Sequence, residues 1–108
     1  MVYEEIEIRA KVIAVQDGEK KLHKNFTSAY RSIRLKAGRK YYRVFLSPTQ
    51  MDKYGVMPTQ GMWFRVKGSI IPPKKELYDP VIKKIVVFEH IDPPIIQQII
   101  EKYNRNNR

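Results

Sequence analysis

A chain of 108 residues has room for one hydrophobic core, and 43% hydrophobic with 30% charged residues is typical of a globular domain rather than a disordered chain. Lys and Arg number 21 against 11 Asp and Glu, a formal charge of +10, so a polyanion is the simplest partner. Nucleic acid is favoured; an anionic membrane surface, a ribosomal RNA environment and an acidic protein are the alternatives. The absence of cysteine excludes disulfides, thiolate zinc sites and a cysteine nucleophile.

The N-terminus is acidic and lacks the apolar run of a secretory signal. Every apolar stretch is shorter than the roughly 18 residues that a membrane-spanning helix needs. These features predict a soluble, cytoplasmic protein without a membrane partner.

Apolar and charged residues alternate from Glu5 to Val15, which predicts a strand with one buried face. At Ile13 and Val15 the parity that carries charged residues earlier in this run becomes apolar, which indicates a bend or bulge. The following stretch, Asp17 to Tyr30, is polar and lysine-rich, and it opens with the turn dipeptide Asp17-Gly18. We expect a long, mobile loop there.

Two alternating runs, Arg31 to Lys36 and Arg39 to Leu46, flank Gly38 and predict a β-hairpin. The stretch from Ser47 to Gly55 begins with Ser-Pro and closes on glycine, which favours one or two helical turns.

A further alternating run from Met62 to Ile71 predicts a strand that bends or bulges at Gly68. The proline-bounded stretch from Pro72 to Pro80 predicts a loop before a last strand around Lys83 to Ile91. Asp92-Pro93 is a good helix start, and a stripe at helical spacing follows, made of Ile95, Ile96, Ile99, Ile100 and Tyr103.

This order of elements resembles the oligonucleotide/oligosaccharide-binding (OB) fold, a five-stranded Greek-key barrel with a short helix between strands 3 and 4. The resemblance is strongest around Gly61, Val66, Gly68 and Ile70, which are similar to the fourth-strand pattern of this fold. We therefore predict an all-β barrel over residues 1–91, a C-terminal α-helix over 92–104 and a frayed tail over 105–108. A small barrel of the SH3-like kind is the alternative.

The resemblance, which extends to single-stranded-DNA-binding and replication protein A-like proteins, implies a ligand face on the second and third strands. It also implies that the first-to-second and fourth-to-fifth loops flank this face. In this chain those loops are the stretches Asp17 to Tyr30 and Pro72 to Pro80.

Strand parity predicts which side chains point outward. If Ile33, Leu35, Tyr42, Val44 and Leu46 fill the barrel, together with Met62, Phe64 and Val66 of the fourth strand, cations and aromatic rings share its outer face. The candidate nucleic-acid contacts on the strands are Arg9, Lys11, Arg34, Lys36, Tyr41, Arg43, Phe45, Trp63, Arg65 and Lys67. Rings that stack on bases and cations that hold phosphates are what a sequence-tolerant single-strand site needs. The alternative is an ordinary solvated face whose rings are covered by loops or by the C-terminal helix.

Each predicted loop also carries cations and one aromatic ring. The candidates are Lys24 and Phe26 in the first loop, near Lys20, Lys21 and His23, and Lys74, Lys75 and Tyr78 in the second. They suit flexible clamps on a bound strand, or solubilising loops whose rings fold back on the barrel.

Signals for an enzyme are weak, because His23 and His90 lie far apart and the glycines are isolated rather than grouped in a phosphate-binding loop. We expect neither a cofactor nor a metal. The predicted function is non-enzymatic binding of nucleic acid, with single-stranded DNA favoured over RNA. The alternative is an accessory subunit of a replication, transcription or ribosomal assembly. Its isoleucine helix would then pack on a protein partner or a second copy, whereas in a lone chain it would cap the barrel.

Overall fold

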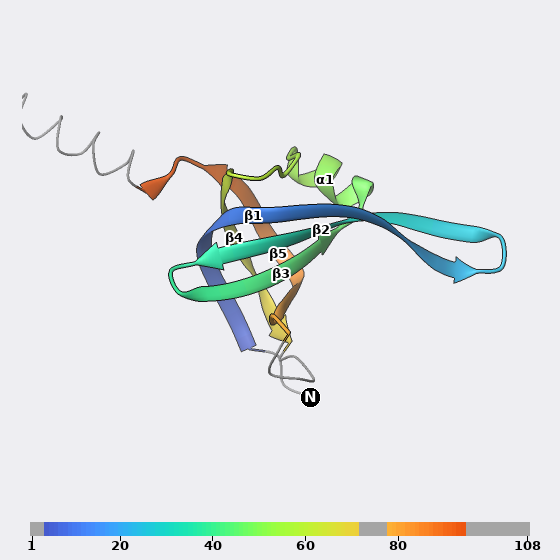
Figure 1. The fold of residues 1–108 in the computed structure, drawn as a ribbon, viewed down its shortest axis with the longest axis horizontal. Coiled ribbons are helices and arrows are strands. Elements are labelled where there is room, and N and C mark those ends of the chain that lie inside the picture. The colour runs from blue at the N-terminus through green and yellow to red at the C-terminus, as the bar shows by residue number, and fades with distance from the viewer. Residues whose placement is uncertain (1–3, 72–77, 95–108) are drawn as a thin grey trace, which may run out of the picture.

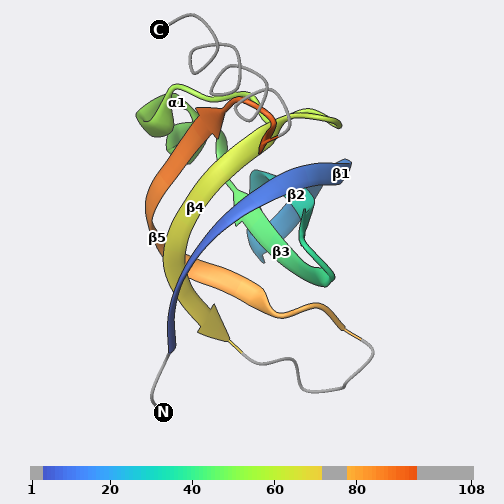
Figure 2. The same cartoon turned by 90° about the vertical axis from the view of Figure 1, so that its left-hand side faces the viewer.

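The computed structural model describes residues 4–71 and 78–94, apart from the side chain of Leu22. These residues form the strands β1 (Glu4–His23), β2 (Phe26–Ala37), β3 (Lys40–Leu46), β4 (Trp63–Ile71) and β5 (Val81–Ile91), with one helix, α1 (Pro48–Tyr54). The strands pair in the order β1-β2-β3-β5-β4, and β4 pairs again with β1, so the sheet closes in a ring (Figures 1 and 2). The predicted mostly-β, barrel-like architecture is confirmed.

Strand β1 bends and serves two neighbours. Its first part, from Glu4 to Lys11, pairs with β4, and the part from Lys11 onward pairs with β2. The register shifts between Val12 and Ala14, which confirms the predicted irregularity at Ile13.

The predicted loop from Asp17 to Tyr30 was wrong. Strands β1 and β2 instead continue as a two-stranded antiparallel ribbon that projects from the barrel to a turn at Lys24-Asn25 (Figure 1). Gly18 is not in a turn; it lies inside β1, directly opposite Tyr30. Water surrounds both faces of such a ribbon, so its sequence lacks the alternation that marks a half-buried strand.

The core confirms the parity predicted for the second, third and fourth strands. The side chains that point into the ring are fully or almost fully buried, and they include Ile33, Leu35, Tyr42, Val44, Leu46, Phe64 and Val66. Ala10 and Val12 of β1, and Ile82 and Phe88 of β5, complete this core. Outward residues of the same strands are therefore available to a ligand.

Helix α1 begins and ends at the predicted residues. Ser47 and Gln50 form a reciprocal capping box, and Gly55 ends the helix in a left-handed conformation with φ 64°. Tyr54 donates a hydrogen bond from its hydroxyl to the carbonyl oxygen of Ile85 at 2.7 Å. This bond holds the helix against β5 at one end of the barrel (Figure 2).

The bulge predicted at Gly68 is confirmed, because the pairing of β4 with β5 shifts register between Lys67 and Ser69. A Cβ atom on Gly68 would lie 2.7 Å from the backbone oxygen of Lys83 and 2.9 Å from Cγ2 of Ile82. Glycine is thus required for the close approach of the two strands.

Several predicted features lie outside the described residues. These are most of the stretch from Pro72 to Pro80, the greater part of the helix predicted over 92–104, and the tail 105–108. Among the helices that the structure describes, none is long and apolar enough to span a membrane.

Candidate nucleic-acid interface

Strands β2 and β3 bring the predicted basic and aromatic side chains together on one outer face. In their register Arg34 lies opposite Arg43, and Lys36 lies opposite Tyr41. Phe45 continues this face and exposes 43% of its surface. Side chains directly opposite each other in an antiparallel pair share a face, so the candidates of these two strands form one surface.

Arg34 is held by two neighbours within this surface. Its Nε donates to Oδ2 of Asp79 at 2.8 Å, and its guanidinium carbon lies 4.3 Å from the centre of the Tyr41 ring. The hydrogen bond to the Asp79 carboxylate raises the pKa of Arg34 above its usual value. Arg34 thus carries a partly neutralised charge and covers one face of Tyr41.

Arg43 ties this face to the segment that precedes β5. Its Nη1 donates to Oγ of Ser32 at 2.7 Å, and its backbone N–H donates to the carbonyl oxygen of Pro80 at 2.9 Å. Arg43 also forms the one parallel pair of β3 with β5, opposite Val81. This contact places the start of β5 beside the β2–β3 face.

The base of the ribbon adds a further aromatic ring to this face. Tyr30 lies edge-on to Phe45, with ring centres 5.7 Å apart. The space that Tyr30 occupies exists because its strand partner is glycine: a Cβ atom on Gly18 would lie 2.6 Å from Cζ of Tyr30. A cross-strand aromatic ring packed over a strand glycine is a known stabilising device.

Three hollows in the surface share Val81, and together we call them the Val81 site. One, of about 410 Å³, is lined by Arg34, Arg43, Tyr78, Asp79 and Val81. The second, of about 480 Å³, has in its wall Tyr30, Phe45, Lys20, Lys83 and Glu19. The third, of about 410 Å³, extends toward α1 and includes Phe45, Tyr54, Gln50, Lys53 and residues Val81 to Ile85. The Val81 site therefore combines aromatic rings with cations over a continuous stretch.

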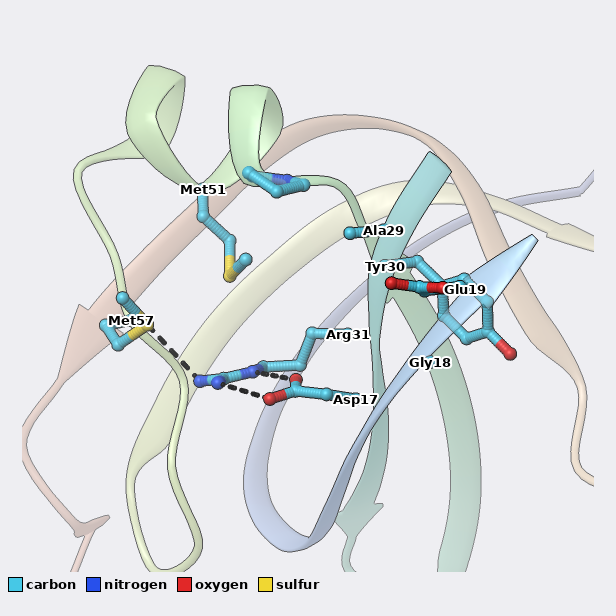
Figure 3. Close-up of a pocket in the computed structure, with 9 residues that line it drawn as sticks. Asp17, Gly18, Glu19, Ala29, Tyr30, Arg31, Met51 and Met57 are labelled. Atoms are coloured by element: carbon cyan, nitrogen blue, oxygen red, sulfur yellow. Dashed lines mark hydrogen bonds and ion pairs between the residues drawn. The ribbon is translucent and has the colours of Figure 1, made fainter. Parts of the chain in front are cut away.

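The opposite face of the ribbon has a different character. Figure 3 shows Met51, Met57 and the Arg31–Asp17 ion pair around a hollow at the base of the ribbon, whose lining also includes Gly18, Glu19 and Tyr30. Arg31 donates to both carboxylate oxygens of Asp17, at 2.7 and 3.1 Å, and to the carbonyl oxygen of Pro58 at 3.0 Å. These bonds link the base of the ribbon to the segment after α1.

The first and fourth strands place their predicted cations on a different, mixed-charge surface. Arg9, Lys11 and Lys67 are exposed there, and Trp63 is partly buried between Lys11 and Ile91 in the register. Arg65 is bonded to two carboxylates, Glu7 at 2.9 Å and Glu89 at 2.9 Å. The basic surface expected to continue across the sheet is thus interrupted by acidic partners.

The remaining candidates are scattered. Lys24 lies in the turn at the tip of the ribbon and Phe26 directly follows that turn, where Phe26 is 58% exposed and stacks on His23. Neither residue lines the Val81 site. Tyr78 is 63% exposed and does reach the Val81 site. Lys74, Lys75 and the partner stripe of Ile95, Ile96, Ile99, Ile100 and Tyr103 lie outside the described residues.

Sequence reasoning missed several residues of the Val81 site, among them Tyr30, Lys53, Asp79, Val81 and Lys83. Tyr30 was placed at the end of a loop, although its alternation with Ser32 and Arg34 continues the β2 pattern and was a usable signal. Val81 and Lys83 come from β5, whose contact with β3 joins residues far apart in the chain. No local pattern marks that contact.

No protein-family model matches this chain, and neither the curated proteins nor the solved structures contain a significant match to it. Within residues 4–71 and 78–94, no group of three His, Asp or Glu side chains is placed to bind a metal ion.

Proposed function

We propose that this protein binds single-stranded nucleic acid, with DNA favoured over RNA, through the Val81 site and without catalysing a reaction. The observation that carries the proposal is the meeting of aromatic rings, of which Phe45 and Tyr78 are exposed, with cations at Val81. Phe45, Tyr30 and Tyr78 offer rings to bases, and Lys20, Lys53 and Lys83 offer charges to phosphates.

The sheet order supports this assignment, because we interpret the closed order β1-β2-β3-β5-β4 with α1 between β3 and β4 as the OB fold. In that fold oligonucleotides bind to the face of strands 2 and 3 and to the loops before strand 2 and before strand 5. In this chain the Val81 site combines Arg34, Arg43 and Phe45 of β2 and β3 with Tyr78 and Asp79, which precede β5, whereas the turn before β2 lies at the far end of the ribbon.

A single strand fits the chemistry better than a duplex. Stacking on Phe45 or Tyr78 needs an unpaired base whose face is free. Each stacked base contributes roughly 1–3 kcal/mol, so two or three rings suffice for useful affinity.

The test is fluorescence anisotropy of a labelled oligothymidine of about 12 nucleotides, within the span expected for one such domain. Four cations, Lys20, Arg43, Lys53 and Lys83, predict that log K falls with log salt with a slope of about −3. Phe45→Ala should weaken binding about tenfold, and Phe26→Ala, the matched loss of an exposed ring at the ribbon tip, should weaken it less. Affinity that is undetectable, or independent of salt, would contradict the proposal. An RNA oligonucleotide of the same length tests the preference for DNA.

The hollow on the opposite face of the ribbon favours a second candidate function, that of an accessory subunit held by protein contacts. This hollow, of about 500 Å³, is lined in part by Pro48, Met51 and Met57, and Met57 is 60% exposed. Flexible methionine side chains are common at protein-binding surfaces. Light scattering of the wild type and of Met57→Lys tests whether a second copy of the chain covers this surface. A wild-type dimer that becomes monomeric in Met57→Lys supports coverage by a second copy, and a monomer in both proteins contradicts it.

A further inference from the structure

The charge arrangement at one end of the Val81 site is unexpected for a surface that binds phosphates. Asp79 places a carboxylate against Arg34 in the hollow that Arg43 also lines, and its side chain is only 16% exposed. A carboxylate repels phosphates, and the exposed arginine with which it pairs gains little stability from the contact. Stability alone is therefore a weak reason for a carboxylate at this position.

The Asp79 carboxylate retains acceptor capacity. Arg34 holds the carboxylate as a fork that is closed tightly on one side only, with Nε donating to Oδ2 at 2.8 Å and Nη2 to Oδ1 at 3.4 Å. An ionised carboxylate can accept up to about four hydrogen bonds, and a ligand with two neighbouring donors can replace the weakly closed fork. The ion pair also fixes the direction of the carboxylate and offsets its charge, which lets a phosphate backbone pass nearby.

We propose that this end of the Val81 site is a base-specific subsite for guanine, an inference that rests on the proposed function. The hollow of about 410 Å³ is within the size range of ligand pockets, and Tyr78 supplies an exposed ring beside Asp79. A base stacked on Tyr78 would direct its Watson–Crick edge toward the carboxylate, while Arg34 and Arg43 hold the adjacent phosphates.

Guanine is the base that matches an acceptor with two oxygens. Its N1–H and N2–H₂ groups are two neighbouring donors, and they fit the two carboxylate oxygens as an arginine fork does. The guanine edge would take the place of the Arg34 fork, which frees Arg34 for the adjacent phosphate. Adenine and cytosine place an acceptor nitrogen next to their amino group, and thymine places carbonyl oxygens on both sides of N3–H. Those lone pairs would face the Asp79 carboxylate and oppose binding.

The experiment compares labelled oligothymidines of about 12 nucleotides in which one central thymidine is kept or replaced by deoxyguanosine, deoxycytidine, deoxyadenosine or deoxyinosine. We expect the deoxyguanosine strand to bind about tenfold more tightly than the others at the same salt concentration. Deoxyinosine keeps N1–H, O6 and N7 but lacks the amino group, so it should lose most of the preference. Retention of the full preference with deoxyinosine would show that the arginines read O6 and N7 instead and would overturn the assignment to Asp79.

Asp79→Asn gives the second arm of the test. It should bind oligothymidine at least as well as the wild type, because a negative charge is removed, and it should lose the preference for deoxyguanosine. Asp52→Asn makes the same charge change on α1, outside this hollow, and should keep that preference.

These experiments distinguish failure of the guanine subsite from failure of single-strand binding. Equal binding of all four natural bases, a preference for deoxycytidine, or a guanine preference that survives Asp79→Asn overturns the guanine subsite and leaves single-strand binding intact. Loss of binding to every oligonucleotide overturns both.

Discussion

The Gly18→Ala substitution tests whether the ribbon supplies a working part of the Val81 site. The new Cβ atom would lie 2.6 Å from both Cζ and Oη of Tyr30 and 3.1 Å from its Cε2, whereas ordinary contacts lie at 3.4–4 Å. The ring must therefore move by about 1 Å or rotate away. Because Cζ and Oη are at the free end of a side chain, the backbone of the ribbon need not move.

The expected cost in stability is small. Moving Tyr30 weakens its edge contact with Phe45, which is worth about 0.5–1.5 kcal/mol. Replacing a strand glycine by alanine returns about 0.5–1 kcal/mol of backbone entropy. The free energy of unfolding, measured by urea denaturation, should thus change by less than about 1 kcal/mol.

The expected cost in binding is larger. Tyr30, Phe45, Lys20 and Lys83 line the same hollow, so a displaced ring disturbs a stacking position worth roughly 1–3 kcal/mol. We expect oligothymidine to bind about tenfold more weakly to Gly18→Ala. In a Tyr30→Ala background the same substitution should have no further effect on affinity. Two results would refute the reasoning. One is wild-type affinity in Gly18→Ala. The other is that Gly18→Ala lowers affinity as much in the Tyr30→Ala background as it does in the wild type.

Three further predictions concern other parts of the structure. Gly68→Ala should lower the free energy of unfolding by about 2–3 kcal/mol in urea, because its Cβ would meet backbone that cannot move aside easily; a change near zero would contradict the packing. The hydrogen bond from Arg31 lowers the pKa of Asp17 below its usual value of 3.8, so the pair stabilises the fold above that pH and the effect is lost as pH falls through the folded-state pKa. Asp17→Asn should accordingly lower Tm at pH 7, and the difference from wild type should disappear once Asp17 is protonated in acid; an equal difference at all pH values would contradict it. Arg65→Met should change oligonucleotide affinity less than twofold, whereas Lys83→Met should weaken it several-fold and reduce the salt slope by about 0.7; equal effects would place the binding surface elsewhere.

Much of the barrel could be predicted from local patterns. The alternation in β2, β3 and β4 has one buried face, and its periodicity therefore identified Ile33, Val44 and Phe64 as inward residues. The two ends of α1 were equally predictable, because serine at position 47 is a favourable N-cap and glycine at position 55 readily adopts the left-handed conformation that ends a helix.

The ribbon and the ion pairs could not be predicted in this way. Both faces of the ribbon are exposed to solvent, so its strands have no hydrophobic periodicity. The dipeptide Asp17-Gly18 is typical of a turn, and only the pairing of Gly18 with Tyr30 explains the glycine within a strand. From the sequence, Arg34 and Arg65 were predicted to be available to phosphates. The carboxylates that bind them, Asp79 and Glu89, lie 45 and 24 residues away in the chain, so no local pattern indicates these ion pairs.

The location of the Val81 site follows from how the ring closes. Strands β3 and β5 meet at one parallel pair, Arg43 with Val81, whereas the other neighbouring strands share long antiparallel ladders. Side chains on both sides of this short contact are not covered by a continuing ladder, and the three hollows lie there. A ligand at the Val81 site would touch β3 through Phe45 and β5 through Lys83, and it would bridge the least extensive pairing in the sheet. Binding to the folded state alone raises stability by linkage. A bound oligonucleotide should therefore stabilise the contact between β3 and β5 that closes the barrel, as well as occupy the surface.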